Sequence, residues 1–90
     1  MELSALETAY QSSMRYLRGV ADRPVGSSAG ASALRAKLGG PMPEQGEEPA
    51  RVIAALARDA DPGIVATAGP RYFGFVVGGS LPAALGADWL

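Results

Sequence analysis

The stretch Gly69–Leu90 reads GPRYFGFVVGGSLPAALGADWL and is the most distinctive part of the chain. Its first half, Tyr72–Val77, is rich in aromatic and β-branched residues, which favour extended backbone, although Gly74 interrupts the run. Its second half begins with Ser80 and Pro82, residue types that favour the N-cap and the first turn of a helix. The stretch therefore predicts an extended aromatic segment followed by a C-terminal helix, whose apolar face is formed by Leu81, Leu85 and Trp89.

A long amphipathic helix is predicted at the opposite end of the chain. Ser4 and Glu7 fit a capping box at its start, and Pro24 ends it, because the residue before a proline disfavours helical backbone. Its apolar stripe recurs at three- and four-residue steps and consists of Leu3, Leu6, Tyr10, Ser13 or Met14, Leu17 and Val20. Two interpretations of this stripe stay open: it packs on another subunit or a further domain, or it packs locally within the chain.

Two shorter helices are predicted between these ends. The first begins at Ser27 or Ser28 and runs to about residue 38, where Gly39-Gly40 stops it. The second begins at about Glu47, since acidic residues suit the positive end of a helix. Its predicted buried face consists of Val52, Ile53, Leu56 and Ala60. After the turn that follows it, Ile64–Thr67 is predicted as a short strand.

The composition excludes several classes of function. Ninety residues make one small domain, and the chain contains neither cysteine nor histidine, so the commonest metal ligands and the commonest general acid–base group are absent. Eight basic and nine acidic residues leave a net charge of −1, without the basic stripe that nucleic-acid binding requires. No apolar run is long enough for a membrane span and no secretory signal is present, so we expect a cytoplasmic protein.

Few residues are candidates for chemistry. Lys37 is the only lysine and is interpreted as a solvated charge, because a nucleophilic lysine needs a desolvated pocket. Gly78-Gly79-Ser80 before a helix is interpreted as an N-cap turn, with anion contact as the less favoured alternative. The aromatic residues Tyr72, Phe73 and Phe75 form either a core cluster, which composition favours, or one wall of a ligand pocket. We expect no catalytic residue and no metal site in this chain.

Gly69–Leu90 resembles the segment written HPRFFGFVxGGxxPAALAADWL near the N-terminus of the pyridoxal-phosphate-dependent group II decarboxylases, the family of the aromatic amino acid and glutamate decarboxylases. Upstream, YLRGVADRPVGSS resembles the family's first long helix and its exit, and GGPMPEQGEEPARVIAALA resembles its PLPExG turn and following helix. The resemblance covers almost the whole chain in the same order. One departure is Gly69, where many relatives carry histidine.

The resemblance implies that residues 1–90 are a mainly α-helical N-terminal segment of a fold type I α/β enzyme, a pyridoxal-phosphate-dependent decarboxylase that acts on an amino acid. The family's cofactor lysine lies downstream of the matched segment, so we expect this chain to be inactive alone. The N-terminal helices of relatives pack across a homodimer. The matching stretch in relatives lines the substrate pocket, partly beside the neighbouring subunit's cofactor. Residues implied for that pocket wall are Phe75, Val76, Val77, Gly78, Gly79 and Ser80. The alternative is a small, non-enzymatic helical interaction module.

Overall fold

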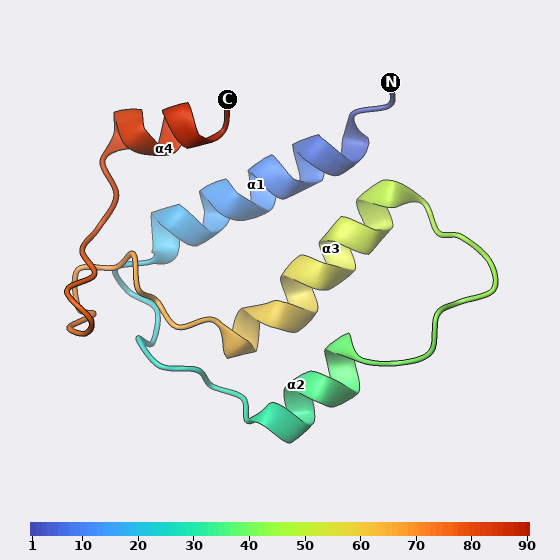
Figure 1. The fold of residues 1–90 in the computed structure, drawn as a ribbon, viewed down its shortest axis with the longest axis horizontal. Coiled ribbons are helices and arrows are strands. Elements are labelled where there is room, and N and C mark those ends of the chain that lie inside the picture. The colour runs from blue at the N-terminus through green and yellow to red at the C-terminus, as the bar shows by residue number, and fades with distance from the viewer.

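The computed structural model describes residues 1–90 and consists of helices joined by loops, with no strand. The α-helices are α1 (Ser4–Gly19), α2 (Ala31–Leu38), α3 (Pro49–Ala60) and α4 (Pro82–Asp88), and the 3-10 helix η1 (Asp61–Gly63) directly follows α3. Figure 1 shows the order α4, α1, α3, α2 across the molecule, with α1 and α3 side by side and running in the same direction. The predicted mainly helical chain is thus confirmed. None of these helices is long and apolar enough to cross a bilayer.

The start of α1 differs from the predicted capping box. Leu3 is the N-cap residue and its side chain caps nothing, while Ser4 is already helical. The carboxylate of Glu7 accepts a hydrogen bond from Gln11 at 2.7 Å and does not reach back to the cap. The amide of Ser4 donates instead to the carboxylate of Glu2. The capping-box prediction was therefore wrong, because a neighbouring acidic side chain satisfies the first free amide.

The start of α3 follows the sequence prediction, whereas the start of α2 does not. The carboxylate of Glu48 accepts hydrogen bonds from the amides of Ala50 and Arg51 at 3.3 and 3.1 Å, and Pro49 occupies the first helical position. By contrast, α2 begins only at Ala31, after the uncapped Gly30. The serine caps predicted for α2 at residues 27 and 28 were wrong, since those hydroxyls are bound elsewhere.

Gly39 ends α2 as predicted, and the structure shows why glycine is needed there. The amide of Gly39 donates to the carbonyl of Arg35 at 2.8 Å. A Cβ atom on Gly39 would lie 2.7 Å from that same carbonyl oxygen, which is closer than real Cβ contacts allow. The next residue, Gly40, has a φ of +146°, a region that side chains rarely adopt.

The strand predicted at Ile64–Thr67 and the extended segment predicted at Tyr72–Val77 were both wrong. In Ile64–Thr67 the only backbone hydrogen bond to a distant segment runs from the amide of Ala66 to the carbonyl of Val25, at 2.8 Å. In Tyr72–Val77 the chain turns back: the amide of Val77 donates to the carbonyl of Gly74 at 3.0 Å, and both residues between them have positive φ. A strand needs a ladder of partners, and no second strand is available.

The start and the apolar face of α4 were only partly predicted. Pro82 occupies the first turn as expected, but Leu81 is the N-cap residue and no side chain caps the helix. The predicted cap by Ser80 was therefore wrong. Leu85 and Trp89, on the predicted apolar face, remain at least one third exposed.

The predicted buried face of α3 was half wrong. Ile53 and Ala60 are half-buried, whereas Val52 and Leu56 are exposed. Ala50 and Ala57 on this face are also half-buried, and the half-buried residues of α1 are mostly small, including Ala5, Thr8, Ser12 and Gly19. The two helices therefore pack mostly through small side chains, and most of their large apolar side chains remain exposed.

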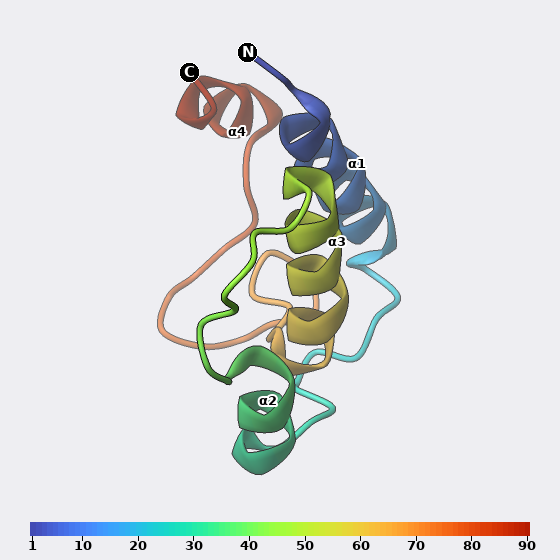
Figure 2. The same cartoon turned by 90° about the vertical axis from the view of Figure 1, so that its right-hand side faces the viewer.

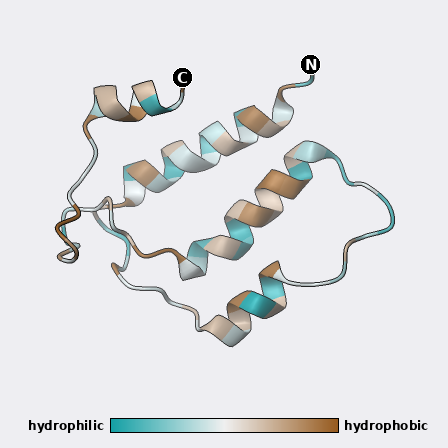
Figure 3. Ribbon diagram, viewed as in Figure 1, coloured by the Kyte–Doolittle hydropathy of each residue, from teal (hydrophilic) through white to brown (hydrophobic).

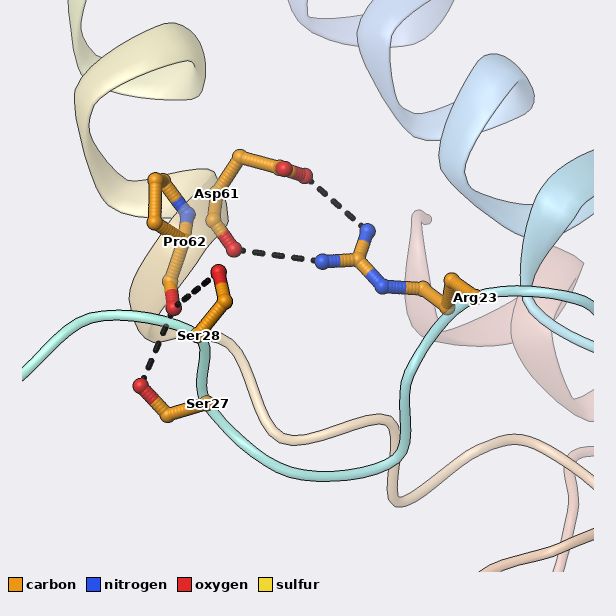
Figure 4. A network of polar contacts seen from close by, with 5 residues as sticks. All are labelled: Arg23, Ser27, Ser28, Asp61 and Pro62. Carbon is orange, nitrogen blue, oxygen red and sulfur yellow. Dashed lines mark hydrogen bonds and ion pairs between the residues drawn. The ribbon is translucent and has the colours of Figure 1, made fainter.

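A polar network joins the chain after α1 to the chain after α3 (Figure 4). The guanidinium of Arg23 donates to the Asp61 carboxylate at 2.9 Å and to the Asp61 carbonyl at 3.1 Å. The carbonyl of Pro62 accepts from the amide of Ser28 at 2.8 Å and from the hydroxyl of Ser27 at 3.0 Å, and it lies 3.3 Å from the Ser28 hydroxyl. These contacts fix the two helix exits beside each other.

Arg71 fastens a third segment to the same place. Its guanidinium donates to the carbonyl of Ala21 at 3.1 Å and to the carbonyl of Arg23. The guanidinium of Arg23 in turn lies over the ring of Tyr16, 4.9 Å from its centroid. The loop that leads to α4 is therefore anchored at the exit of α1.

These residues do not close an apolar core. Ala66, 1% exposed, is the only buried residue. The accessible surface is 7191 Å², whereas a compact monomer of 9.2 kDa exposes about 4,900 Å², so about 2,300 Å² more than expected is open. The radius of gyration is 15.1 Å, against about 12 Å for a compact domain of this length. Large apolar surfaces therefore lie outside.

We predict that Asp61→Ala lowers the free energy of unfolding by about 1 kcal/mol, because it removes an ion pair whose arginine is four-fifths buried and which joins distant segments. The matched control is Asp59→Ala, which removes the ion pair between the adjacent residues Arg58 and Asp59. Urea denaturation followed by circular dichroism measures both variants. Equal losses in the two variants would contradict a linking role for Asp61.

Candidate functional site

A large, mainly apolar cleft lies between α1 and α4, with the chain after η1 at its base. Its volume is about 1060 Å³. We call it the α1–α4 cleft. Its apolar lining comprises Tyr10, Met14, Leu17 and Val20 of α1, Ile64, Val65 and Ala68 after η1, and Pro82, Leu85 and Trp89 at α4.

The two helical walls of the cleft are amphipathic stripes already visible in the sequence. Tyr10, Met14 and Leu17 are three or four residues apart and so share one side of α1. Leu85 and Trp89 do the same on α4. The helices touch where the rings of Tyr10 and Trp89 meet edge to face, with centroids 6.0 Å apart and an interplanar angle of 87°. The stripe of α1 is thus covered locally in part, although Leu3 and Leu6 are each 58% exposed.

The six residues implied for a pocket wall lie in the loop that leads to α4. Phe75 and Val76 form its turn and are almost completely exposed, as Val77–Ser80 largely are. Of the six, only Ser80 lines the α1–α4 cleft. This structure therefore does not gather them around a cavity of their own, and their role in a pocket remains a prediction.

The aromatic cluster is not a core in this structure. Tyr72 is half-buried, but Phe73 and Phe75 are each 92% exposed. The sequence interpretation that composition favoured, a core cluster, was therefore wrong. Without other protein around them, these two rings face water.

Nothing near Gly78-Gly79-Ser80 supports anion binding. The α4 helix has seven residues, and its N-cap is Leu81. The nearest arginine in the sequence, Arg71, is bound to backbone carbonyls at the exit of α1. The three residues form no backbone hydrogen bond as donors, so they act as a plain tether between the turn and α4.

Gly69 stands where many members of the resembled family carry histidine. At this position the loop before α4 lies close to the end of α1. A Cβ atom there would lie 3.1 Å from the carbonyl oxygen of Val20 and 3.2 Å from that of Ala66. Any side chain at this position would therefore press against backbone on two sides. Glycine lets the loop lie against the exit of α1, where Arg71 fastens it.

The charged groups show no catalytic arrangement. Lys37 is exposed on α2. A side-chain hydrogen bond from Arg58 lowers the pKa of Asp59, and the same contact raises the pKa of Arg58. Hydrogen bonds from Ser4 lower the pKa of Glu2. These are surface contacts outside the α1–α4 cleft, and no group of three or more His, Cys, Asp or Glu side chains is placed to hold a metal ion.

Comparisons of the chain with protein-family models, with curated proteins and with solved structures found no match.

We predict that Tyr10→Ser releases α4 from α1, because the edge-to-face contact of Tyr10 with Trp89 joins the two helices. Trp89 is the only tryptophan, so its fluorescence reports on this contact directly. The emission maximum should shift to longer wavelength and quenching by iodide should increase. The control is Tyr72→Ser, outside the cleft. An unchanged Trp89 spectrum in Tyr10→Ser would contradict the docking of α4.

Proposed function

We propose that this chain is the N-terminal part of a cytoplasmic, pyridoxal-phosphate-dependent amino acid decarboxylase, a carboxy-lyase of fold type I. In that enzyme it contributes dimer contacts and one wall of the substrate pocket. The observation that carries the proposal is the stretch Pro70–Leu90, which resembles the family's pocket segment and whose rings Phe73 and Phe75 face water. Apolar rings that are so exposed are typical of a segment that is covered by other parts of a larger protein or by a partner.

The proposed dimer contact uses the outer part of α1. Leu3 and Leu6 are more than half exposed and lie at the end of α1 beyond Tyr10. Exposed apolar residues in a row on one helix face are typical of a surface that packs on a second helix. Burying them against the partner subunit stabilises a homodimer by removing apolar area from water.

The proposed pocket wall uses two properties of the loop before α4. The ring of Phe75 offers a flat apolar face for the substrate side chain. Gly78 has no side chain, and no atom lies within 4 Å of where its Cβ would be, so a substrate or cofactor could approach the backbone closely. Both residues bind and orient; neither transfers a proton.

The residues of this chain do not fit pyridoxal phosphate by themselves. The single lysine, Lys37, is exposed on α2, and the cationic side chain of the loop before α4, Arg71, is bound to backbone carbonyls at the exit of α1. Pyridoxal phosphate held in the complete enzyme would supply an electron sink for the loss of the carboxylate. In the proposed enzyme, residues outside this segment hold it.

The proposal is tested most directly by reading the DNA beyond the codon for Leu90. A continuing frame that encodes a His-Lys pair after a predicted strand supports the decarboxylase. A frame without such a segment favours the alternative, a small helical interaction module.

We predict that the ninety-residue chain forms no stoichiometric covalent adduct with pyridoxal phosphate and decarboxylates no amino acid. Lys37 lacks the desolvated setting that lowers the pKa of a nucleophilic lysine. Visible absorption spectra during titration with pyridoxal phosphate measure the adduct. A one-to-one absorption band that disappears in Lys37→Arg would contradict the prediction.

In the complete enzyme, we predict that Phe75→Ala lowers kcat/KM at least about tenfold with little change in melting temperature, because Phe75 contacts substrate and not the core. A buried core phenylalanine would instead cost about 3–5 kcal/mol of stability and leave the kinetics of the folded enzyme near normal. Steady-state kinetics beside thermal unfolding separates these two outcomes.

Mixed dimers test whether Gly78 acts across the interface. One subunit carries Gly78→Val and the other lacks the cofactor lysine. If Gly78 serves the partner's site, both defects fall on one site and about half of the activity remains. If Gly78 serves its own subunit, each site carries one defect and activity is almost lost. The second result would remove Gly78 from the shared wall.

A further inference from the structure

The loop before α4 ends in an apolar projection, which we call the apolar tip and define as Phe73–Val77. Both rings are 92% exposed and Val76 is fully exposed. In Figures 1 and 2 the loop that leads to α4 stands away from the helices, and Figure 3 colours part of this loop brown, the hydrophobic end of the scale. An apolar projection of this kind is costly in water unless another surface covers it.

The backbone of the apolar tip is also strained. Phe75 has a φ of +52° and Val76 a φ of +57°. Left-handed backbone is disfavoured for bulky residues, and a β-branched valine there is an outlier. The turn holds both side chains outward, and only the contacts they make can offset its cost.

The same chain contains a hollow that could accept such a projection, the α1–α4 cleft. Most of its lining residues are aliphatic or aromatic, with a few polar ones such as Ser13 and Thr67 among them, and Leu17 and Leu85 are each about one third exposed there. None of the three large tip residues Phe73, Phe75 and Val76 lines the cleft of its own chain. One molecule therefore exposes both a projection and a hollow of matching chemistry, as an isologous dimer requires.

The areas agree with a stable dimer. A phenylalanine buries about 150–250 Å², so two rings and a valine inserted into the cleft cover roughly 800 Å² per copy when the lining is included. Two such reciprocal contacts give about 1,600 Å² in total, within the range of stable interfaces. The excess exposed surface of the chain, about 2,300 Å², is large enough to supply this area.

We propose that two copies of this chain associate by inserting the apolar tip of each into the α1–α4 cleft of the other. This contact differs from the proposed dimer contact through Leu3 and Leu6, and it concerns the ninety residues as they stand. It therefore does not rest on the decarboxylase: in a complete enzyme, further protein would cover the tip.

Disulfide trapping tests the proposal, because the chain has no cysteine of its own. Phe75→Cys and Leu17→Cys are made in separate copies, one of them enlarged by a tag, and the mixture is oxidised. We expect the mixed disulfide dimer to exceed both same-variant dimers. The matched control pairs Met42→Cys with Leu17→Cys, since Met42 is a highly exposed apolar residue outside both tip and cleft. A mixed yield no higher than this control overturns the proposal.

Two further outcomes would also overturn it. In a chain carrying both cysteines, a disulfide that forms within the monomer would place the tip in its own cleft. The second is a strong disulfide between two Leu6→Cys copies together with no disulfide between Phe75→Cys and Leu17→Cys copies. It would place the dimer contact on α1 alone. That last result leaves the dimer contact of the proposed function standing, so the two proposals fail separately.

Light scattering over a dilution series gives an independent measurement. The unmodified chain should be dimeric, and Phe75→Ser should raise the dimer dissociation constant at least about tenfold, as loss of a central aromatic contact does. Met42→Ser should leave the constant unchanged. A chain that is monomeric or unfolded at high concentration, or equal effects of the two substitutions, contradicts the proposal.

Discussion

The bidentate contact between Arg23 and Asp61 is the interaction on which the arrangement of the helices depends. It holds the end of α1 beside the end of α3, and the carbonyl of Pro62 then receives donors from the chain that leaves α1. Ala66 is buried just beyond this junction, with its amide bound to Val25. An arginine suits the position because its planar fork satisfies a carboxylate and a backbone carbonyl together.

A junction held by polar contacts leaves the apolar residues free for other partners. The helices α1 and α3 meet through small side chains, so Leu3, Leu6 and Leu56 gain little from the local packing and stay exposed. A small domain gains most of its stability from buried apolar area, and Ala66 is the one fully buried residue of this chain. Both proposals made for this protein, a segment of a larger decarboxylase and a self-associating chain, supply the missing cover from outside.

The α1–α4 cleft illustrates how much of a site could be predicted from the sequence. The stripe containing Tyr10 and Leu17, and the one containing Leu85 and Trp89, follow from helical spacing alone. That the two stripes face each other depends on the path of the loop between them, which Arg71 and Gly69 fix at the exit of α1. Contacts between residues so far apart in sequence leave no local pattern, so spacing could not predict them.

Local signals in the sequence account for the helices, because helical periodicity, Pro49 and Pro82 in first turns, and the glycine stop at Gly39 act within a few residues. Contacts between distant segments set the features that the local signals did not predict. Ser27 and Ser28 bind the distant carbonyl of Pro62 and so do not cap α2, a competition between local and long-range acceptors. Phe75 and Val76 lie in a turn and face water, since a β-strand forms only where a neighbouring strand pairs with its backbone, and the fold provides none.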